Sequence, residues 1–291
     1  MPLRLLPSGT CIIDETYMPE LPEVETIARD LNQTVLSKKI TAVKVNDPYI
    51  IKGLNPKSFI GQIKGAVICG VYRRGKALVL TLSNQLFWVV QPMMTGQMVY
   101  VYPHEQPALL KETRLIVTLA DGGTLLYNDQ RRFGHLRLVR DINSIKYFKI
   151  IGPEPLTDDL TEDYLLSRIQ ASTRPIKNIL LDHTVIAGIG NIYASEILFR
   201  TRISPLRCGS TIRKQDIVPL IKNIRAVLSE AIVHRGSSMR NYRDGRGQKG
   251  AFNKLIQVYA RIGQACVVCQ RPIIRVVQSG RSTFYCKHCQ Q

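Results

Sequence analysis

Apolar residues are spaced mainly as in β-strands before about residue 150 and as in helices after it. In the first part, residues 22–36 place Ile27, Leu31 and Val35 at the interval that buries one face of a helix. Short apolar runs follow, with turn residues between them, and they predict strands at 41–45, 66–71, 77–82, 86–90, 98–101, 115–119, 124–127 and 136–139. Eight short strands at this spacing favour a β-sandwich or barrel.

The Gly-Pro-Glu-Pro sequence at 152–155 interrupts this pattern and predicts a domain boundary. Beyond it the apolar spacing predicts helices at 162–169, 175–181, 192–199 and 214–233. The Gly-rich, basic segment 236–250 is typical of a mobile loop or a solvated linker. The sequence therefore predicts an α+β protein of two domains, with an N-terminal β-sandwich at 18–150, a helical domain at 151–250 and a small cysteine module at 256–291.

The charge balance narrows the class of partner. The net charge is +18 and the pI is about 9.8, which suits nucleic acid or an anionic membrane, although a generically basic protein also fits. From residue 240 to 291 there are ten Lys and Arg and one acidic residue, without an amphipathic basic helix, which favours nucleic acid. No run approaches the roughly 18 apolar residues that span a bilayer, and residues 1–17 do not resemble a secretory signal. We therefore expect a cytoplasmic protein.

Four of the seven cysteines lie in two Cys-x-x-Cys pairs near the end of the chain, at Cys266, Cys269, Cys286 and Cys289. Two such pairs can close a tetrahedron of thiolates around one Zn²⁺, and the alternative is two disulfides. Four thiolates leave no open position, so the ion would be structural. The segment between the pairs predicts a β-hairpin that turns at Ser279-Gly280, which places Arg281 near its tip.

Five segments, taken together, resemble a known family. Residues 18–26, Met-Pro-Glu-Leu-Pro-Glu-Val-Glu-Thr, are similar to the amino terminus of bacterial formamidopyrimidine-DNA glycosylase (Fpg). Arg-Arg-Gly-Lys at 73–76, Asp-Gln-Arg-Arg-Phe-Gly at 129–134, Gly-Ile-Gly-Asn-Ile-Tyr-Ala-Ser-Glu at 188–196 and the four cysteines match the same family in the same order. The resemblance covers 18–291 and implies a helix–two-turn–helix DNA-binding motif in the helical domain.

The resemblance implies base-excision DNA repair by a bifunctional glycosylase/AP lyase. Such an enzyme removes 8-oxoguanine and formamidopyrimidines from duplex DNA through a Schiff base on its N-terminal Pro, then cleaves the strand by β,δ-elimination. The matching residues here are Pro19 as nucleophile, Glu20 as general acid, and Lys76 and Arg281 in the elimination steps. An internal Pro nitrogen is a tertiary amide and cannot attack, so we expect the functional chain to begin at Met18 and residues 1–17 to be an extension.

The resemblance also implies how damaged DNA is held by a monomeric enzyme. Met94, Arg131 and Phe133 match the residues that fill the gap left by the flipped nucleotide, and Arg131 would pair with the estranged cytosine. Taken singly, Met94 and Phe133 are more often core residues. Phosphate contacts are implied for Lys177 and Asn191, with Arg174 beside them. The start of the helix at 192–199 would cradle a phosphate on its free N–H groups, unless Asn191 simply caps it.

Three positions depart from the family pattern, and two other functions stay open. Gln91 and Glu112 stand where the family has His, and Ser172 stands where a basic residue is common, with Arg174 as a possible compensation.

A zinc-containing DNA-binding protein without catalysis is the alternative function if Pro19 stays internal. An endonuclease VIII-like enzyme for oxidised pyrimidines is another, although Leu21, with the Arg131–Phe133 segment, favours the purine branch.

Overall fold

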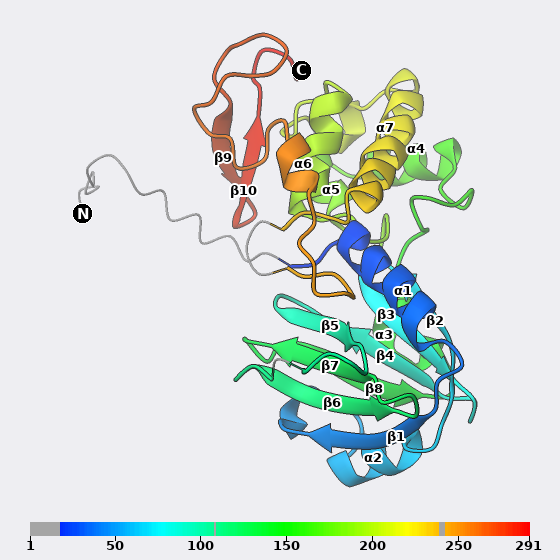
Figure 1. The fold of residues 1–291 in the computed structure, drawn as a ribbon. Coiled ribbons are helices and arrows are strands. Elements are labelled where there is room, and N and C mark those ends of the chain that lie inside the picture. The colour runs from blue at the N-terminus through cyan, green and yellow to red at the C-terminus, as the bar shows by residue number, and fades with distance from the viewer. Residues whose placement is uncertain (1–17, 108, 239–241) are drawn as a thin grey trace, which may run out of the picture.

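The computed structural model describes residues 18–107, 109–238 and 242–291 (Figure 1). The expected extension at 1–17 lies outside the described residues. The first half of the chain forms two four-stranded antiparallel sheets, with strand orders β1-β6-β7-β5 and β2-β3-β4-β8. Their bounds are β1 Ile40–Val45, β2 Ile68–Arg74, β3 Ala77–Leu82, β4 Phe87–Gln91, β5 Gly96–Val101, β6 Thr113–Leu119, β7 Thr124–Asp129 and β8 His135–Val139. The eight predicted strands and the predicted α+β class are confirmed.

The two sheets bury one shared core, which includes the fully buried side chains of Trp88, Leu115 and Tyr127. Burial alternates along β6, as expected of a strand with one face toward a core. The helix α1 (Leu21–Val35) adds Ile27 and Leu31 to this core. A second helix, α2 (Pro56–Ile63), was not predicted, although the side chain of Asn55 caps it by accepting the Ser58 N–H.

The second half of the chain is helical and has its own core. Its helices are α4 Glu162–Gln170, α5 Ile176–Leu180, α6 Asn191–Arg200 and α7 Lys214–Val233. The short helix α3 (Lys146–Ile150) instead packs Phe148 against Val79 and Val89 of the sandwich. Short 3₁₀ turns lie in both halves, at Pro48–Ile50, Ile142–Ser144, Gly209–Thr211 and Phe252–Leu255. The chain ends in a hairpin of β9 (Ile274–Gln278) and β10 (Arg281–Tyr285), which turns at Ser279-Gly280. The four predicted helices and the hairpin are confirmed.

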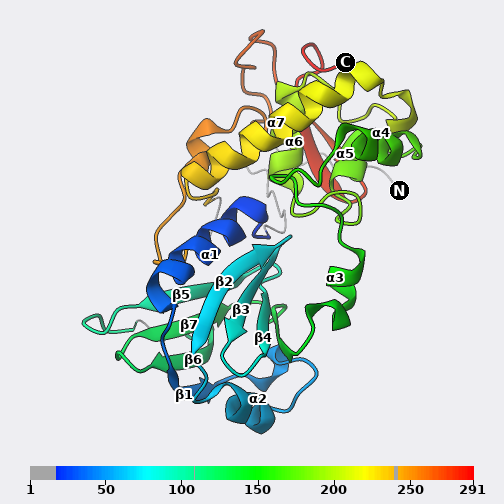
Figure 2. The same ribbon diagram turned by 90° about the vertical axis from the view of Figure 1, so that its right-hand side faces the viewer.

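The helix α1 joins the two halves. It lies along the strands β2 and β3 on one side and against α7 on the other (Figure 2). Its first residue also contacts the helical half, because the Leu21 N–H donates to the Gly188 carbonyl over 3.0 Å. The amino-terminal end of α1 therefore lies where the two cores meet. In the described part of the chain, no helix has the length and apolar character needed to cross a bilayer.

Candidate active site

The segment that enters α1 ends in a carboxylate that caps a helix of the other half. Pro19 and Glu20 are both buried. Glu20 Oε1 accepts the Ile192 N–H over 2.9 Å, and Oε2 lies 3.5 Å from the Tyr193 nitrogen, at the start of α6. A carboxylate at this position satisfies unpaired N–H groups and complements the helix dipole.

This contact corrects the predicted phosphate cradle. The N–H groups at the start of α6 face an internal carboxylate, because Gly190 lets the chain pass close to Glu20: a Cβ at position 190 would lie 2.2 Å from Glu20 Cδ. The N-cap of α6 is Gly190, so Asn191 is not the cap either. Its predicted contact with DNA stays a prediction, and here its side chain donates to the Ser282 carbonyl over 3.0 Å.

The environment of Glu20 suits a proton donor at neutral pH. Burial raises the pKa of the Glu20 carboxyl to about 7, and the negative charge of Glu23 adds to this. The ammonium of Lys76 and the N–H groups of α6 act in the opposite direction. A carboxyl group with a pKa near the working pH is well matched to general acid catalysis.

Lys76 and Arg281 share this electrostatic environment. Burial lowers the pKa of the Lys76 ammonium, and the charge of Arg281 lowers it further, while Glu20 and Glu23 raise it. Lys76 comes directly before β3, and its N–H donates to the Tyr147 hydroxyl over 3.0 Å. The charges of Glu20, before α1, and of Arg281, on the terminal hairpin, therefore both act on Lys76 in the β2–β3 turn.

The two arginines before Lys76 have a structural role. Arg73 Nη1 and Arg74 Nη1 donate to the two oxygens of Glu154, over 2.5 Å and 2.9 Å. The Gly75 N–H donates to the same carboxylate over 2.7 Å. Glu154 lies in the Gly-Pro-Glu-Pro segment, so this carboxylate ties the β2–β3 turn to the segment that joins the two halves.

Glu23, in the first turn of α1, is a fully buried hydrogen-bond acceptor. Its carboxylate accepts the Glu20 N–H over 2.9 Å, the Tyr193 hydroxyl over 2.6 Å and the Ser237 N–H over 2.7 Å. Burial raises its pKa, and these donors oppose the rise. The Tyr242 hydroxyl donates to the Glu23 carbonyl over 3.2 Å. One residue thus connects α1, α6 and both ends of the segment 237–242.

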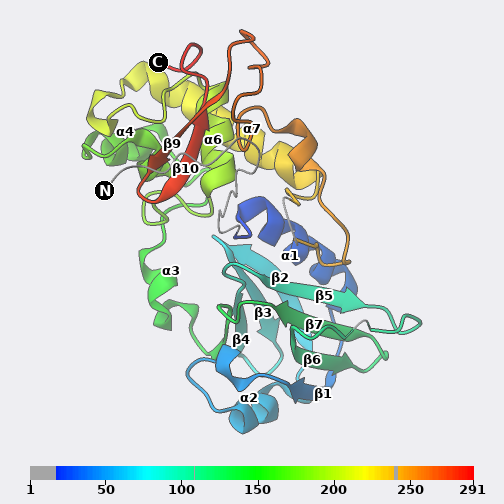
Figure 3. The ribbon, with the colours of Figure 1, turned by 90° about the vertical axis from the view of Figure 1, so that its left-hand side faces the viewer.

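The terminal hairpin is anchored beside this cluster, with β10 lying next to α6 (Figure 3). Lys177 of α5 is fully buried, and its ammonium donates to the Ser282 carbonyl over 3.0 Å and to Thr283 Oγ1 over 2.8 Å. Its predicted phosphate contact therefore stays a prediction. In this structure Lys177 and Asn191 hold Ser282, which follows the exposed Arg281 in sequence.

The three residues predicted to fill the gap in DNA lie on two turns of the sandwich. Met94 lies between β4 and β5, and Arg131 and Phe133 lie between β7 and β8. Phe133 is 45% exposed, and the Arg131 guanidinium lies 4.8 Å from the centre of its ring. An exposed aromatic side chain covered by an arginine is suited to contact with bases.

Two of the positions that depart from the family pattern have internal partners. Gln91 Oε1 accepts from Arg137 Nη1 over 2.7 Å. Arg174 is exposed, and its guanidinium contacts Asp182 over 3.0 Å and Ser172 Oγ over 3.2 Å. An arginine already paired with a carboxylate is a weaker phosphate ligand than an unpaired one, so we expect Arg174 to compensate only in part for Ser172.

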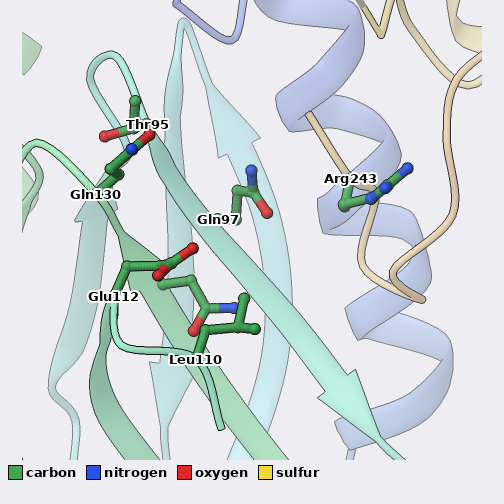
Figure 4. A pocket seen from close by; sticks show the side chains of 7 residues that line it. Thr95, Gln97, Leu110, Glu112, Gln130 and Arg243 are labelled. Atoms are coloured by element: carbon green, nitrogen blue, oxygen red, sulfur yellow. The ribbon is translucent and has the colours of Figure 1, made fainter. Parts of the chain in front are cut away.

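Glu112, the third departure, lines a polar pocket of about 250 Å³ beside these turns (Figure 4). The other lining residues are Thr95, Gln97, Leu110, Asn128, Gln130 and Arg243. They come from β5 and the turn before it, from β7 and the turn after it, from the loop before β6 and from the basic segment after α7, so the pocket spans both halves of the chain. None of the four predicted catalytic residues lines it.

The four cysteines form a candidate metal site at the base of the terminal hairpin. Their sulfur atoms all lie within 4.8 Å of one another, with 3.9 Å between Cys266 and Cys289 and 3.5 Å between Cys269 and Cys286. These separations are far longer than a disulfide bond and close to the ~3.8 Å edge of a zinc–thiolate tetrahedron. The donor set therefore fits a metal ion better than two disulfides.

A further buried carboxylate was missed. Glu196 of α6 is fully buried and accepts the N–H groups of Gln257, Val258 and Tyr259 over 2.8–3.0 Å. It thereby holds the segment that leads to the cysteines against α6. The signal was an acidic residue inside the otherwise apolar run from Ile192 to Phe199.

Three family models match the chain. They are the formamidopyrimidine-DNA glycosylase N-terminal domain at residues 18–136, the formamidopyrimidine-DNA glycosylase H2TH domain at 151–243, and the zinc finger found in FPG and IleRS at 263–291. The matches include the Pro-Glu start, the α6 region and the four cysteines.

Individual relatives agree with these matches. Formamidopyrimidine-DNA glycosylase from Desulfitobacterium hafniense is 38% identical over 94% of this chain and 100% of its own length, and the enzyme from Carboxydothermus hydrogenoformans is 41% identical over the same shares. The crystal structure of the Thermus thermophilus Fpg protein is 36% identical, with a TM-score of 0.83 over 94% of this chain and 98% of that one. A Lactococcus lactis Fpg variant, solved with Fapy-dG-containing DNA, is 32% identical, with a TM-score of 0.86 over 94% and 100%.

Proposed function

The chain belongs to the formamidopyrimidine-DNA glycosylase family of DNA repair, and we propose that it is a bifunctional glycosylase/AP lyase for oxidised purines. Its substrates would be 8-oxoguanine and formamidopyrimidines in duplex DNA. One observation carries the proposal: Glu20, Lys76 and Arg281 share one electrostatic environment at the amino-terminal end of α1, next to Pro19.

In the proposed reaction, the Pro19 nitrogen attacks the anomeric carbon of the damaged nucleotide. A C–N bond forms as the glycosidic bond breaks, and the base leaves with the electron pair of that bond and takes up the proton that the amine loses. Glu20 gives its proton to the sugar ring oxygen, the ring opens, and an iminium remains on the amine. Lys76, whose pKa is lowered, is suited to take a proton from the opened sugar, and Arg281 to hold the departing phosphates.

This chemistry requires a free amine at Pro19. We propose that the functional chain begins at Met18 and that this Met is removed. An ordinary α-amino group has a pKa of about 8, so a useful fraction is neutral at pH 7. The intact mass of the native protein checks the proposal, and a mass that includes residues 1–17 would contradict it and favour a DNA-binding protein without catalysis.

Borohydride trapping tests the function directly. Protein that starts at Pro19 is mixed with a duplex that carries 8-oxoguanine opposite C, and the iminium is reduced. A covalent protein–DNA band is expected, which disappears in Pro19→Gly and in protein that retains residues 1–17. A gel shift without a covalent band would contradict the enzyme and leave a DNA-binding protein.

The same assay distinguishes the lesion classes. Cleavage of 8-oxoguanine opposite C is expected to exceed cleavage of thymine glycol, and the reverse order would assign the chain to oxidised pyrimidines instead.

The partner would be double-stranded DNA, bound by a monomeric protein in the cytoplasm. Similar solved structures include complexes of Lactococcus lactis Fpg with Fapy-dG-containing and abasic-site-containing DNA.

We propose zinc as the ion at Cys266, Cys269, Cys286 and Cys289. The ion would fold the terminal hairpin and would supply no chemistry to the reaction. One zinc per chain is expected by atomic emission, and a metal-free protein with full activity would contradict this assignment.

A further inference from the structure

The two turns that carry Met94, Arg131 and Phe133 are joined through one buried carboxylate. Asp129, the last residue of β7, is fully buried. Its Oδ1 accepts a short hydrogen bond from the Thr95 hydroxyl, and its Oδ2 accepts the Gly134 N–H over 2.7 Å. Thr95 belongs to the first turn and Gly134 ends the second, so the carboxylate contacts both.

The hydroxyl of Thr95 extends this connection to the residue that would read the opposite strand. While it donates to Asp129, its oxygen accepts the Arg131 N–H over 2.9 Å. The main chain of Arg131 is therefore fixed to the turn that carries Met94. Figure 4 shows Thr95 and Gln130 at this junction, where β5 begins and β7 ends.

A glycine on each turn lets the main chain of that turn approach the Tyr127 ring closely. A Cβ on Gly96 would lie 2.3 Å from the Tyr127 hydroxyl oxygen, and a Cβ on Gly134 would lie 1.7 Å from the same atom. The Tyr127 oxygen fills this space and has no hydrogen-bond partner among the described residues. The two turns thus pack on one phenol and one carboxylate, which leaves little room for them to move independently.

We propose that Asp129 is a positioning residue that makes the two turns act as one unit in reading the base opposite the lesion. The proposal rests on the proposed function, because it assumes that Arg131 contacts the estranged base. Asp129 itself is buried and touches no DNA. Its effect would pass through Thr95 to the Arg131 main chain and through Gly134 to the end of the Phe133 turn.

Substitution of Asp129 by Asn tests this inference. An amide keeps one acceptor and gains donors, so it cannot accept from both the Thr95 hydroxyl and the Gly134 N–H. Thr95→Val removes the hydroxyl relay and keeps the shape, whereas Thr95→Ser keeps the hydroxyl. The matched control is Asp121→Asn, which removes the same charge from a turn carboxylate that accepts the Gly123 N–H over 3.0 Å, at the other end of β7.

The readout is the ratio of dissociation constants for duplexes with a tetrahydrofuran abasic analogue opposite A and opposite C. It needs no catalysis, so it is measurable even if borohydride trapping fails and the proposed function is wrong. Wild-type protein, Thr95→Ser and Asp121→Asn are expected to prefer C. In Asp129→Asn and Thr95→Val the ratio of the two dissociation constants is expected to fall about tenfold. That is the loss of discrimination expected when one base contact is removed.

Two results would overturn the inference. One is an unchanged A-to-C ratio in Asp129→Asn and Thr95→Val proteins that melt cooperatively. The other is an equal loss of affinity for both duplexes, which would mean that Asp129 only stabilises the fold.

Discussion

The surroundings of Glu20 and the two exposed turns of the sandwich are built in opposite ways. Four segments from both halves of the chain contribute to the first, and buried hydrogen bonds over long sequence separations hold it together. The turns that carry Met94, Arg131 and Phe133 come from one half alone; Arg131 and Phe133 are exposed and Met94 is half-buried. The proposed chemistry therefore depends on how the two halves are joined, whereas base reading depends on the sandwich.

Removal of the metal site should affect both the fold of the hairpin and the chemistry. Cys286→Ser is expected to unfold the hairpin and to take Arg281 away from Lys76, because so short a module has little core of its own. Strand cleavage should fall by about 100-fold or more, as for a misplaced catalytic group. Zinc content and cleavage of a preformed abasic site are the measurements.

Cys208→Ser is the control, because Cys208 is a half-exposed thiol away from the cluster. If zinc-free Cys286→Ser cleaved at the normal rate, the terminal hairpin would have no part in the chemistry.

The Glu20→Gln variant addresses the proton donor. Base removal should slow by about 10²–10⁴-fold, as expected for loss of a general acid. In wild-type protein the active form needs a protonated Glu20 and a neutral Pro19 amine, so the rate profile should be bell-shaped, with deprotonation of Glu20 causing the alkaline limb and protonation of the amine the acid limb. The residual activity of Glu20→Gln should lack the alkaline limb, and a profile identical to wild type would contradict the assignment.

The same shift predicts a pH dependence of stability. The folded pKa of Glu20, about 7, is above its ordinary value of 4.5, so folding favours the protonated form. The stabilisation is present below pH 4.5 and is lost as the pH rises to about 7. Glu20→Gln should therefore show a flatter dependence of the free energy of unfolding over this window, as measured by urea denaturation.

Glu23→Gln tests whether the same region also holds the fold together. An amide cannot accept from Glu20, Tyr193 and Ser237 as the carboxylate does, and a buried unsatisfied donor costs about 1–3 kcal/mol. The free energy of unfolding should fall by that amount in urea titrations. Glu162→Gln, at the exposed start of α4, is the control, and equal small effects in both variants would show that Glu23 is not a structural centre.

The smallest effect on stability is expected at the exposed turn. Phe133→Ala should change the free energy of unfolding by less than about 0.5 kcal/mol, because its ring is 45% exposed. Binding to a lesion-containing duplex should weaken by about tenfold, the usual loss for one stacking contact. Val277→Ala, on the exposed face of the hairpin, is the control, and unaltered affinity in Phe133→Ala would remove this ring from the DNA interface.

Local patterns predicted the elements well. The eight strands and the four principal helices have short-range signals, namely apolar spacing and turn residues, and the structure confirms them within a few residues at each end. The four cysteines were also predictable, because the spacing of their two pairs is itself local. The helix α2 carried a local signal in Asn55-Pro56, which was overlooked.

Contacts between distant segments were not predictable. Nothing near Ile192 in the sequence shows that its N–H faces Glu20, which is 172 residues away. Lys177 gave no sign that its ammonium is buried against Ser282, because a lysine in a basic protein is usually exposed. Both cases concern N–H or ammonium groups that were assigned to phosphate and that have internal partners in the folded chain.

The cap that Glu20 places on α6 also bears on how relatives of this chain can recombine. A chimaera joined near residue 150 pairs the carboxylate of one parent with the helix of the other. The acceptors of that carboxylate are main-chain N–H groups, which every parent supplies whatever its side chains. The cap itself requires only that the small residue at position 190 is inherited, because a Cβ there would collide with the incoming Glu20. This one contact of the junction is thus compatible with exchange of whole domains, provided that this glycine is retained.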